Sequence, residues 1–341
     1  MRQVWITRVG PPETLQVREA PDPTPDAGQV RIRVEASGIN FADVSARLGF
    51  YPDAPKPPCV VGYEVAGKID ATGPGIDPSR VGEDVLALTR FGGYSDVVVV
   101  PAGQATRRPH GLDAARAAAI PVNYLTAYQM LFAMGRIQSG DRVLIHQAAG
   151  GVGLAAIDLC QLVGGIESYG TASASKHDFI RARGLRHAID YRTRDYEEEV
   201  LRLTGGHGVD LILDPIGGDS WKKGLRLLAP TGRLVCFGMS SVATGKDRSL
   251  VAGLRALASI PWLQVNPMSL MNGNKGVLGV NLGHMWEEAE RLGQWMERIL
   301  GWFGEGKVRP HVDRSFRFDE APAAHAYIQE RRNVGKVLLV P

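Results

Sequence analysis

The strongest chemical signal in the sequence is a glycine-rich turn that joins an apolar strand to a helix. It reads Val143-Leu144-Ile145-His146-Gln147-Ala148-Ala149-Gly150-Gly151-Val152-Gly153. Glycines in such a turn let the backbone approach a pyrophosphate, and the first helical turn offers unpaired N–H groups to its oxygens. Ala148 takes the first glycine position of G-x-G-x-x-G, so the strand and helix on either side carry most of the evidence. The predicted dinucleotide-binding residues of this turn are Ala149, Gly150, Gly151, Val152 and Gly153.

The residues after the next predicted strand indicate which dinucleotide would bind. A site for NAD usually places a carboxylate there to hold the ribose hydroxyls. Here the segment contains small and hydroxyl residues and one lysine, and Glu167 comes too early to serve. Hydroxyls and positive charge suit a 2′-phosphate, and Tyr191 could add a further donor. We therefore expect NADPH, held by Gly170, Thr171, Ser173, Lys176 and Tyr191, with a solvated helix-start lysine as the alternative for Lys176.

These residues need a scaffold that brings strand ends together, and the chain after about residue 124 has that pattern. Apolar segments typical of buried strands alternate with helical segments that are apolar on one face. The expected strands are 142–146, 166–170, 209–213 and 233–237, and the expected helices are 152–163, 176–183, 220–228 and 285–303. Such alternation predicts an α/β fold with a doubly wound parallel sheet covered by helices on both faces.

The chain before about residue 123 is β-rich instead. Val30, Ile32 and Val34 alternate with polar residues, which is the period of a half-buried strand. Segments 65–69 and 97–100 are further strand candidates, separated by glycines and prolines. The segment 335–340 is also β-like, so we expect it to rejoin the first domain.

Composition excludes several classes of protein. The 341 residues are 44% hydrophobic and 22% charged with a net charge of +3, which fits a globular protein of about two domains without a nucleic-acid footprint. We expect no signal peptide and no membrane span, because the one long uncharged stretch, 256–274, contains Pro261 and Pro267. Cys59, Cys160 and Cys236 have no metal-ligand spacing and form no disulfide framework, which predicts a reducing cytoplasm.

Several segments together resemble the medium-chain dehydrogenase/reductase superfamily. They are the glycine turn, Gly62-Tyr63-Glu64-Val65-Ala66-Gly67, and Gly92-Gly93-Tyr94-Ser95-Asp96. The stretch 120–128 and the ending Asn333-Val334-Gly335-Lys336-Val337-Leu338 look like the zinc-less quinone oxidoreductase branch. Within it, that ending and an apolar insert at about 244–276 are closest to the vesicle amine transport protein homologues.

The resemblance implies a two-domain organisation with an active site in the cleft where the domains meet. A GroES-like catalytic domain would comprise residues 1–122 and 307–341, and a Rossmann NADPH-binding domain residues 123–306. Zinc-using relatives have metal ligands at the positions of Asn40 and Tyr63 and near 122–123, and no usual ligand stands there. We expect no metal site, and without a Lewis acid the chemistry favours conjugated carbonyl acceptors over simple ketones.

The resemblance also suggests which side chains could line this cleft. Asn40, Tyr51 and Tyr63 are the candidate catalytic residues, with an ordinary loop aromatic as the alternative for Tyr51 and a non-catalytic place in the site lining as the alternative for Tyr63. Gly279 could mark a close backbone approach, or its strand could pair with a second copy to form a homodimer through the edge of the Rossmann sheet. The further expected cofactor contacts are Asn123, Thr126, Phe237, Gly238, Met239, Asn333 and Lys336.

Three functions fit the sequence. The first is a zinc-independent, NADPH-dependent oxidoreductase that transfers hydride to a quinone or an α,β-unsaturated carbonyl. The second is a nucleotide-regulated lipid-binding or transfer protein, suggested by apolar residues of the insert such as Trp262, Leu263, Met268, Leu270 and Met271. The third is an enoyl-thioester reductase of a polyketide or fatty-acyl pathway, which uses the same hydride chemistry.

Overall fold

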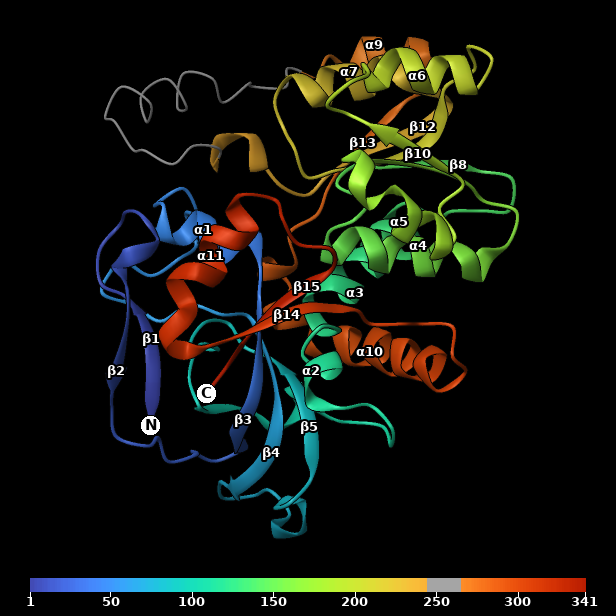
Figure 1. Cartoon of the computed structure of the whole chain (residues 1–341). Helices are drawn as coiled ribbons and strands as arrows, with labels where there is room; N and C mark the ends of the chain where they lie inside the picture. Colours follow the sequence, from blue (N-terminus) through green and yellow to red (C-terminus); the bar gives the residue numbers. More distant parts are fainter. Residues whose placement is uncertain (244–264) are drawn as a thin grey trace. The chain divides into compact units, whose positions relative to one another are not determined.

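A computed structural model of the chain describes residues 1–243 and 265–341 (Figure 1). Their contacts group them into two units, one of residues 1–125 and 282–341 and one of residues 126–243 and 265–281. The sequence placed the return to the first domain at residue 307, so the structure moves that boundary to residue 282. Helix α10 (Ala289–Gly304) therefore lies in the first unit and not in the second.

The first unit is built on a seven-stranded sheet and a two-stranded hairpin. The hairpin consists of β1 (Arg2–Ile6) and β2 (Leu15–Glu19). The sheet has the order β14 (Val312–Arg317), β15 (Lys336–Val340), β3 (Gln29–Ile39), β4 (Glu64–Thr72), β5 (Asp84–Leu88) and β7 (Ala105–Arg107), and β6 (Val97–Pro101) also pairs with β3. Helices α1 (Phe41–Arg47), α2 (Ala114–Ala117) and α11 (Ala321–Gln329) belong to this unit, and α3 (Pro121–Tyr128) begins in it.

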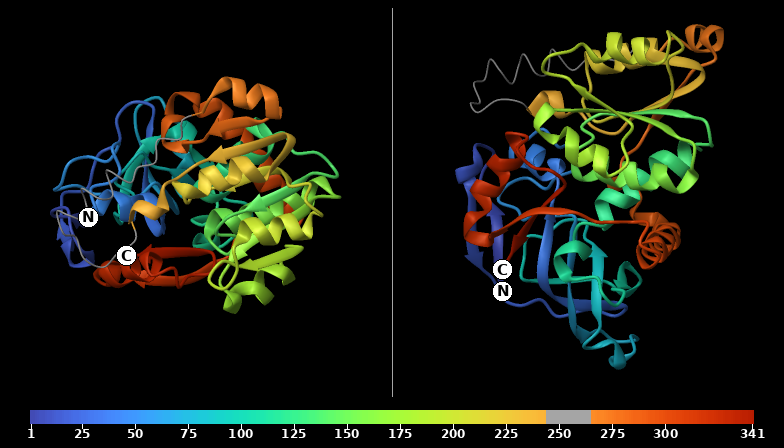
Figure 2. Two further views of the ribbon diagram at one scale, coloured as in Figure 1. Left: turned by 90° about the horizontal axis from the view of Figure 1, so that it is seen from above. Right: turned by 45° about the vertical axis from the view of Figure 1, so that its right-hand side comes forward.

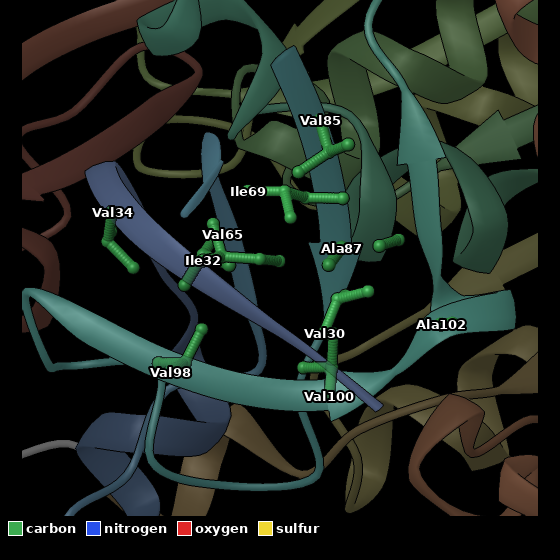
Figure 3. Packing of buried hydrophobic residues seen from close by; sticks show 11 residues of the cluster. Val30, Ile32, Val34, Val65, Ile69, Val85, Ala87, Val98, Val100 and Ala102 are labelled. Atoms are coloured by element: carbon green, nitrogen blue, oxygen red, sulfur yellow. The ribbon is translucent and has the colours of Figure 1, made fainter. Parts of the chain in front are cut away.

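The core of this unit follows the alternation seen in the sequence. Val30, Ile32 and Val34 of β3 are buried, whereas Arg31 and Arg33 between them bind the carboxylate of Asp70. The buried β3 residues pack against valines, an isoleucine and an alanine of β4, β5 and β6 (Figure 3). Strand β15 pairs antiparallel with β3, with Leu338 opposite Gly38, which attaches the C-terminal segment to the middle of this sheet.

Helix α10 joins the first unit because its apolar stripe packs there. Leu292 and Met296 are buried and line a small cavity together with Leu86 and Leu88 of β5. The predicted helix over 285–303 is observed as a 3-10 turn at Trp286–Glu288 followed by α10. The amphipathic pattern thus predicted the helix, but it could not indicate which unit supplies the apolar partner.

The second unit contains a six-stranded sheet in which every pair of neighbouring strands is parallel. Its order is β10 (His187–Asp190), β9 (Glu167–Ala172), β8 (Arg142–Ile145), β11 (Val209–Asp214), β12 (Leu228–Cys236) and β13 (Gly276–Gly279). Helices α4 (Gly151–Val163) and α5 (His177–Ala182) cover one face, and α6 (Tyr196–Leu203), α7 (Asp219–Leu227) and α9 (Pro267–Gly273) cover the other (Figures 1 and 2). A π-helical segment, Gln129–Met134, continues from α3. The predicted doubly wound parallel sheet is confirmed.

The predicted apolar insert is only partly covered by the structure. Trp262 and Leu263 lie outside the described residues, as does the rest of 244–264. The described remainder forms α9, which presents Met268 and Met271 to solvent, and then enters β13 at Gly276. In the parts of the chain that the structure covers, no helix combines the length and the apolar character that crossing a membrane requires.

Candidate functional site

The glycine turn has the geometry of a phosphate cradle at the start of α4. Gly150 is the N-cap in extended conformation, and α4 begins at Gly151. Helix geometry leaves the first N–H groups of α4 without intrahelical acceptors, and the positive end of the helix dipole lies beside them. A Cβ on Gly153 would lie 2.5 Å from the carbonyl oxygen of Gln147, so only glycine lets the helix approach the strand end this closely. The chain therefore fits a dinucleotide pyrophosphate at this turn.

Gly170 and Thr171 support the turn from the neighbouring strand β9. A Cβ on Gly170 would lie 2.7 Å from the Cβ of Ala148, and the N–H of Ala148 donates to the carbonyl of Thr171 at 3.0 Å. The buried Thr171 hydroxyl lies 3.1 Å from Nδ1 of His146 and accepts from the N–H of Gln147 at 3.2 Å. Both residues thus shape the turn from inside, and direct contact with a cofactor stays a prediction.

The loops after β9 and β10 lie side by side at the carboxyl end of the sheet. The register pairs Asp190 with Ala172, so Ser173 and Tyr191 leave adjacent strands at the same level. Ser173 is buried with its hydroxyl 3.4 Å from that of Ser175, whereas Tyr191 is exposed and Lys176 half-buried. Glu167 stands at the opposite end of β9, where it bonds to His187 at 3.0 Å. The loop of residues 173–176 contains no carboxylate, and Glu167 lies at the other end of β9, away from this loop.

Strands β11 and β12 bring a second pair of loops to the same sheet edge. The buried Asp214 carboxylate accepts the N–H groups of Ile216 and Gly217 at 2.6 and 3.1 Å, which fixes the turn after β11. Phe237 donates its N–H to the carbonyl of Asp214 at 3.1 Å. Gly238 and Met239 follow, and Met239 is exposed. The loop after β12 therefore carries the predicted contacts Phe237, Gly238 and Met239, and it leaves the same carboxyl end of the sheet as the glycine turn.

A buried histidine beside this edge was not singled out from the sequence. His146 directly follows β8, its ring meets that of Tyr196 edge-on with centroids 4.6 Å apart, and its Nε2 has no hydrogen-bond partner in the described structure. Burial lowers the pKa of His146, and the charge of Asp214 opposes that change. His146 is thus a neutral packing and hydrogen-bonding group under the glycine turn. Only its place directly before the turn could have drawn attention to it.

Gly279 closes β13, the outer strand of the six-stranded sheet within the described residues. A Cβ built on Gly279 would meet no atom within 4 Å in this part of the chain. The expected close backbone approach therefore does not come from the residues described here. A role at a cofactor or at the edge of a second copy stays a prediction.

The first unit holds a cluster of buried charged and polar side chains around Glu64. Glu64 and Lys336 are 0% and 2% exposed and form an ion pair between β4 and β15. Asn40 bridges the two, because its Oδ1 accepts from the Lys336 ammonium at 2.6 Å and its Nδ2 donates to Glu64 at 3.0 Å. The second Glu64 oxygen accepts the N–H of Val122 in the first turn of α3 at 2.7 Å. The Lys336 ammonium is thus engaged inside this unit by Asn40 and Glu64, and its contact with a cofactor stays a prediction.

Asp43 extends this cluster toward the turn that carries Tyr63. Its carboxylate accepts the N–H of Asn40 at 2.7 Å and the N–H of Gly62 at 3.0 Å. Burial raises the pKa of Asp43 to about 7, against the opposing effects of these hydrogen bonds and of the Lys336 charge. Sequence analysis did not include Asp43 among the site residues, and its place three residues after Asn40 in a capping arrangement was the available signal.

The two candidate catalytic tyrosines lie in one aromatic group. The ring of Tyr63 packs against Phe91 with centroids 5.3 Å apart and meets Tyr51 edge-on at 6.1 Å. Tyr63 is buried and Tyr51 half-buried. Burial raises the pKa of Tyr63 well above its usual value, so its hydroxyl is protonated at neutral pH and can donate a hydrogen bond. The structure therefore brings Tyr51 and Tyr63 together, and Glu64 links the same turn to Asn40.

The remaining predicted contacts hold local backbone. Asn123 is buried and donates from Nδ2 to the carbonyl of Ala119 at 3.0 Å, and Asn333 donates from Nδ2 to the carbonyl of Gly335 at 2.8 Å. Thr126 is buried one turn after Val122 on α3. Their contact with a cofactor stays a prediction.

Within residues 1–243 and 265–341, no group of three or more histidine, cysteine, aspartate or glutamate side chains is arranged to hold a metal ion. Cys59 and Cys160 are buried, and burial raises the pKa of the Cys160 thiol to about 12, so it is a packing residue.

Comparisons with known proteins agree with this architecture. An alcohol dehydrogenase GroES-like domain model matches residues 26–110, and a zinc-binding dehydrogenase model matches residues 183–339. The chain is 41% identical over 329 residues to the synaptic vesicle membrane protein VAT-1 homolog of Homo sapiens, across 96% of this chain and 82% of that one.

Two solved structures resemble the whole chain. Quinone oxidoreductase from Escherichia coli complexed with NADPH is 28% identical, with a TM-score of 0.87 and full coverage of both chains. CurK enoyl reductase is 29% identical, with a TM-score of 0.84 over 99% of this chain and 98% of that one. With its GroES-like sheet completed by β15, its doubly wound sheet and these relatives, the chain belongs to the medium-chain dehydrogenase/reductase superfamily, close to VAT-1 homologues and quinone oxidoreductases.

Proposed function

We propose that the chain is an NADPH-dependent reductase that transfers hydride to a quinone or an α,β-unsaturated carbonyl without a catalytic metal. The observation that carries the proposal is the glycine turn at the start of α4, where Gly153 has no room for a Cβ and the first helical N–H groups are available to a ligand's phosphates. A solved relative that binds NADPH supports the same choice of cofactor. Bound NADPH would supply the hydride.

The preference for NADPH over NADH is argued from the loops after β9 and β10. Ser173, Lys176 and Tyr191 offer two hydroxyls and one ammonium where the carboxylate of an NAD site would repel a 2′-phosphate. A charge-assisted hydrogen bond of an ammonium to phosphate contributes about 1.5–3 kcal/mol. One such contact is enough for a preference of roughly tenfold to hundredfold.

The preference for a conjugated acceptor follows from the groups around Tyr63. Protonated Tyr63 is a hydrogen-bond donor, Tyr51 lies beside it, and neither tyrosine nor Asn40 is a usual ligand for zinc. The charge of an enolate or a hydroquinone anion is delocalised, so these anions need less stabilisation than the localised charge of an alkoxide, and a neutral hydrogen-bond donor can suffice for them. The chain's own residues would then orient the acceptor and exclude water.

The cofactor assignment is tested by Lys176→Ala with Lys222→Ala as a matched control. Lys222 is an exposed lysine of α7 in the same unit, paired with Asp219. We expect Lys176→Ala to weaken NADPH at least tenfold with little change for NADH, while Lys222→Ala changes neither dissociation constant. Equal losses for both cofactors in Lys176→Ala would show that Lys176 does not read the 2′-phosphate.

The acceptor is tested by NADPH consumption with chelator-treated protein and a panel of quinones, enones and enoyl thioesters. Turnover of quinones or enones supports the proposal. Selective turnover of enoyl thioesters would favour the second candidate, an enoyl-thioester reductase, which the likeness to CurK enoyl reductase supports. Tight NADPH binding without any turnover would favour a binding or lipid-transfer protein, for which the exposed Met268 and Met271 of α9 are the relevant observation.

The outer position of β13 supports the further proposal of a homodimer formed through that edge of the sheet. A cytoplasmic location stays a proposal that rests on the three free cysteines.

A further inference from the structure

The cluster around Glu64 connects four segments that are far apart in the sequence. Lys336 of β15 and Glu64 of β4 form the ion pair, Asn40 precedes α1, and Val122 lies in the first turn of α3. Each polar group at its centre has a specific partner: one Glu64 oxygen binds Lys336 and Asn40, and the other binds the N–H of Val122. The cluster is therefore a single hydrogen-bonded unit and not a chance pairing of charges.

The surrounding backbone is shaped to make room for this ion pair. A Cβ on Gly38 of β3 would lie 2.5 Å from a Glu64 oxygen and 2.6 Å from Cε of Lys336. Gly38 is opposite Leu338 in the β3–β15 register, so the glycine allows the two strands to pair while the ion pair passes over β3. The backbone of β3 at Gly38 is thus adapted to the ion pair between β4 and β15.

Stability alone does not explain such a pair, because well-packed apolar residues of similar volume often stabilise a fold as well as a buried ion pair does. What charged groups add is a fixed geometry. The ammonium requires the oxygen of the Asn40 amide to face it, and the Glu64 carboxylate requires the amide nitrogen, so the amide has one permitted orientation. The other Glu64 oxygen holds the first turn of α3, on which Asn123 and Thr126 follow.

We propose that Lys336 and Glu64 are positioning residues for the reduction, acting through the Asn40 amide and the first turn of α3 without touching cofactor or acceptor. The inference rests on the proposed function and deepens it, because it assigns the task of orienting Asn40 and α3 to a buried salt bridge that spans the first unit. Lys336 then contributes geometry, and the chemistry remains with the groups that it orients.

The decisive experiment compares Glu64→Gln/Lys336→Met, which removes both charges together, with the surface pair Lys68→Met/Asp84→Asn as a control. Lys68 lies on the same strand as Glu64 and bonds to Asp84 at 2.9 Å in solvent. We expect the buried double variant to keep cooperative unfolding and to bind NADPH within threefold of the wild type. Its kcat should fall at least tenfold with KM changed less than threefold, while the surface pair leaves all four properties unchanged. Wild-type kcat in the buried double variant would overturn the proposal.

A double-mutant cycle that measures kcat and includes Asn40→Ala tests whether the ion pair acts through Asn40. If the ion pair acts through Asn40, adding Glu64→Gln/Lys336→Met to Asn40→Ala lowers kcat less than threefold further. A full additional tenfold loss would mean that the pair does not work through Asn40. Lys336→Arg, which keeps the charge, should recover at least part of the kcat lost in Lys336→Met.

A measurement without an acceptor separates this inference from the proposed function. Hydrogen exchange of the Val122 amide should be at least tenfold faster in Glu64→Ala than in the wild type, because the acceptor at 2.7 Å is removed. Unchanged protection would overturn the inference even if the wild type reduces quinones. Loss of protection in a protein that reduces no acceptor would instead show that the geometric role holds and that the proposed function fails.

Discussion

Replacing Gly153 by alanine tests whether close packing of α4 on the glycine turn is what binds the dinucleotide. The new Cβ would lie 2.5 Å from the carbonyl oxygen of Gln147 and 2.6 Å from that of Ala148. Because real Cβ contacts below 3.0 Å are essentially never seen, the first turn of α4 must move by about half an ångström. Overpacking of this kind costs about 1–3 kcal/mol, and the better helix propensity of alanine offsets up to about 1 kcal/mol of it.

The cofactor should lose more than the fold does. The displaced first turn carries the N–H groups proposed to hold the pyrophosphate, and each hydrogen bond to a charged group is worth about 1.5–3 kcal/mol. Misplacing one or two of them weakens NADPH binding roughly tenfold to several hundredfold. Titration of NADPH by calorimetry and urea unfolding of the unliganded protein give both quantities.

Gly293→Ala supplies the matched control for this substitution. Gly293 lies inside helix α10, and a Cβ there would meet no atom within 4 Å among the described residues. The variant should be as stable as the wild type or more stable by up to about 1 kcal/mol, with unchanged NADPH affinity. Binding of NADPH by Gly153→Ala within twofold of the wild type would refute the assignment of the turn.

Three further predictions concern the first unit. Because burial raises the pKa of Asp43 in the folded state from its ordinary 3.8 to about 7, the stabilisation linked to its proton is full below about pH 4 and is lost as pH rises through 7. Urea unfolding should therefore show the wild type losing more stability than Asp43→Asn between pH 5 and pH 8, by up to roughly 3 kcal/mol, and parallel pH profiles would contradict this. Tyr63→Phe should lower kcat/KM for the acceptor roughly tenfold to hundredfold with unchanged NADPH affinity, and undiminished steady-state rates would exclude Tyr63 as the donor. Leu292 is buried, so Leu292→Ala should reduce the free energy of unfolding by about 2–5 kcal/mol. Leu201 is 37% exposed, so the control Leu201→Ala should change it by less than about 0.5 kcal/mol. Similar losses in both variants would contradict the packing of α10 on the first unit.

The features that could be predicted from sequence are those encoded within a short segment. Residues 142–163 were predicted correctly as a strand, a glycine turn and a helix, because the signals for all three elements are adjacent in the sequence. The parallel sheet followed from repeating strand–helix units, and its order of strands is the one typical of dinucleotide-binding folds. Alternation at Val30, Ile32 and Val34 likewise marked the buried face of β3 correctly.

The features that could not be predicted depend on partners far away in the chain. Lys336 was expected at the cofactor because its motif resembles that of the family, and nothing near it in sequence indicated Glu64, 272 residues earlier. Helix α10 was expected in the second unit, whereas its contacts group it with the first, because an apolar stripe specifies burial but not the surface that covers it. The raised pKa of Asp43 depends on desolvation, which only the folded structure defines.

The pairing of β15 with β3 has a consequence for the order in which the units can form during synthesis on the ribosome. Gly38 of β3 is opposite Leu338 of β15, which is translated 300 residues later (338 − 38). Strand β3 therefore lacks this neighbouring strand until the end of the chain has been synthesised. Most of the second unit, residues 126–243 and 265–281, has by then emerged, and it contains its own parallel sheet. The second unit can therefore mature first, while Glu64 stays hydrated until Lys336 arrives. A nascent chain stalled before residue 336 should accordingly expose an unfinished first unit to proteases and chaperones.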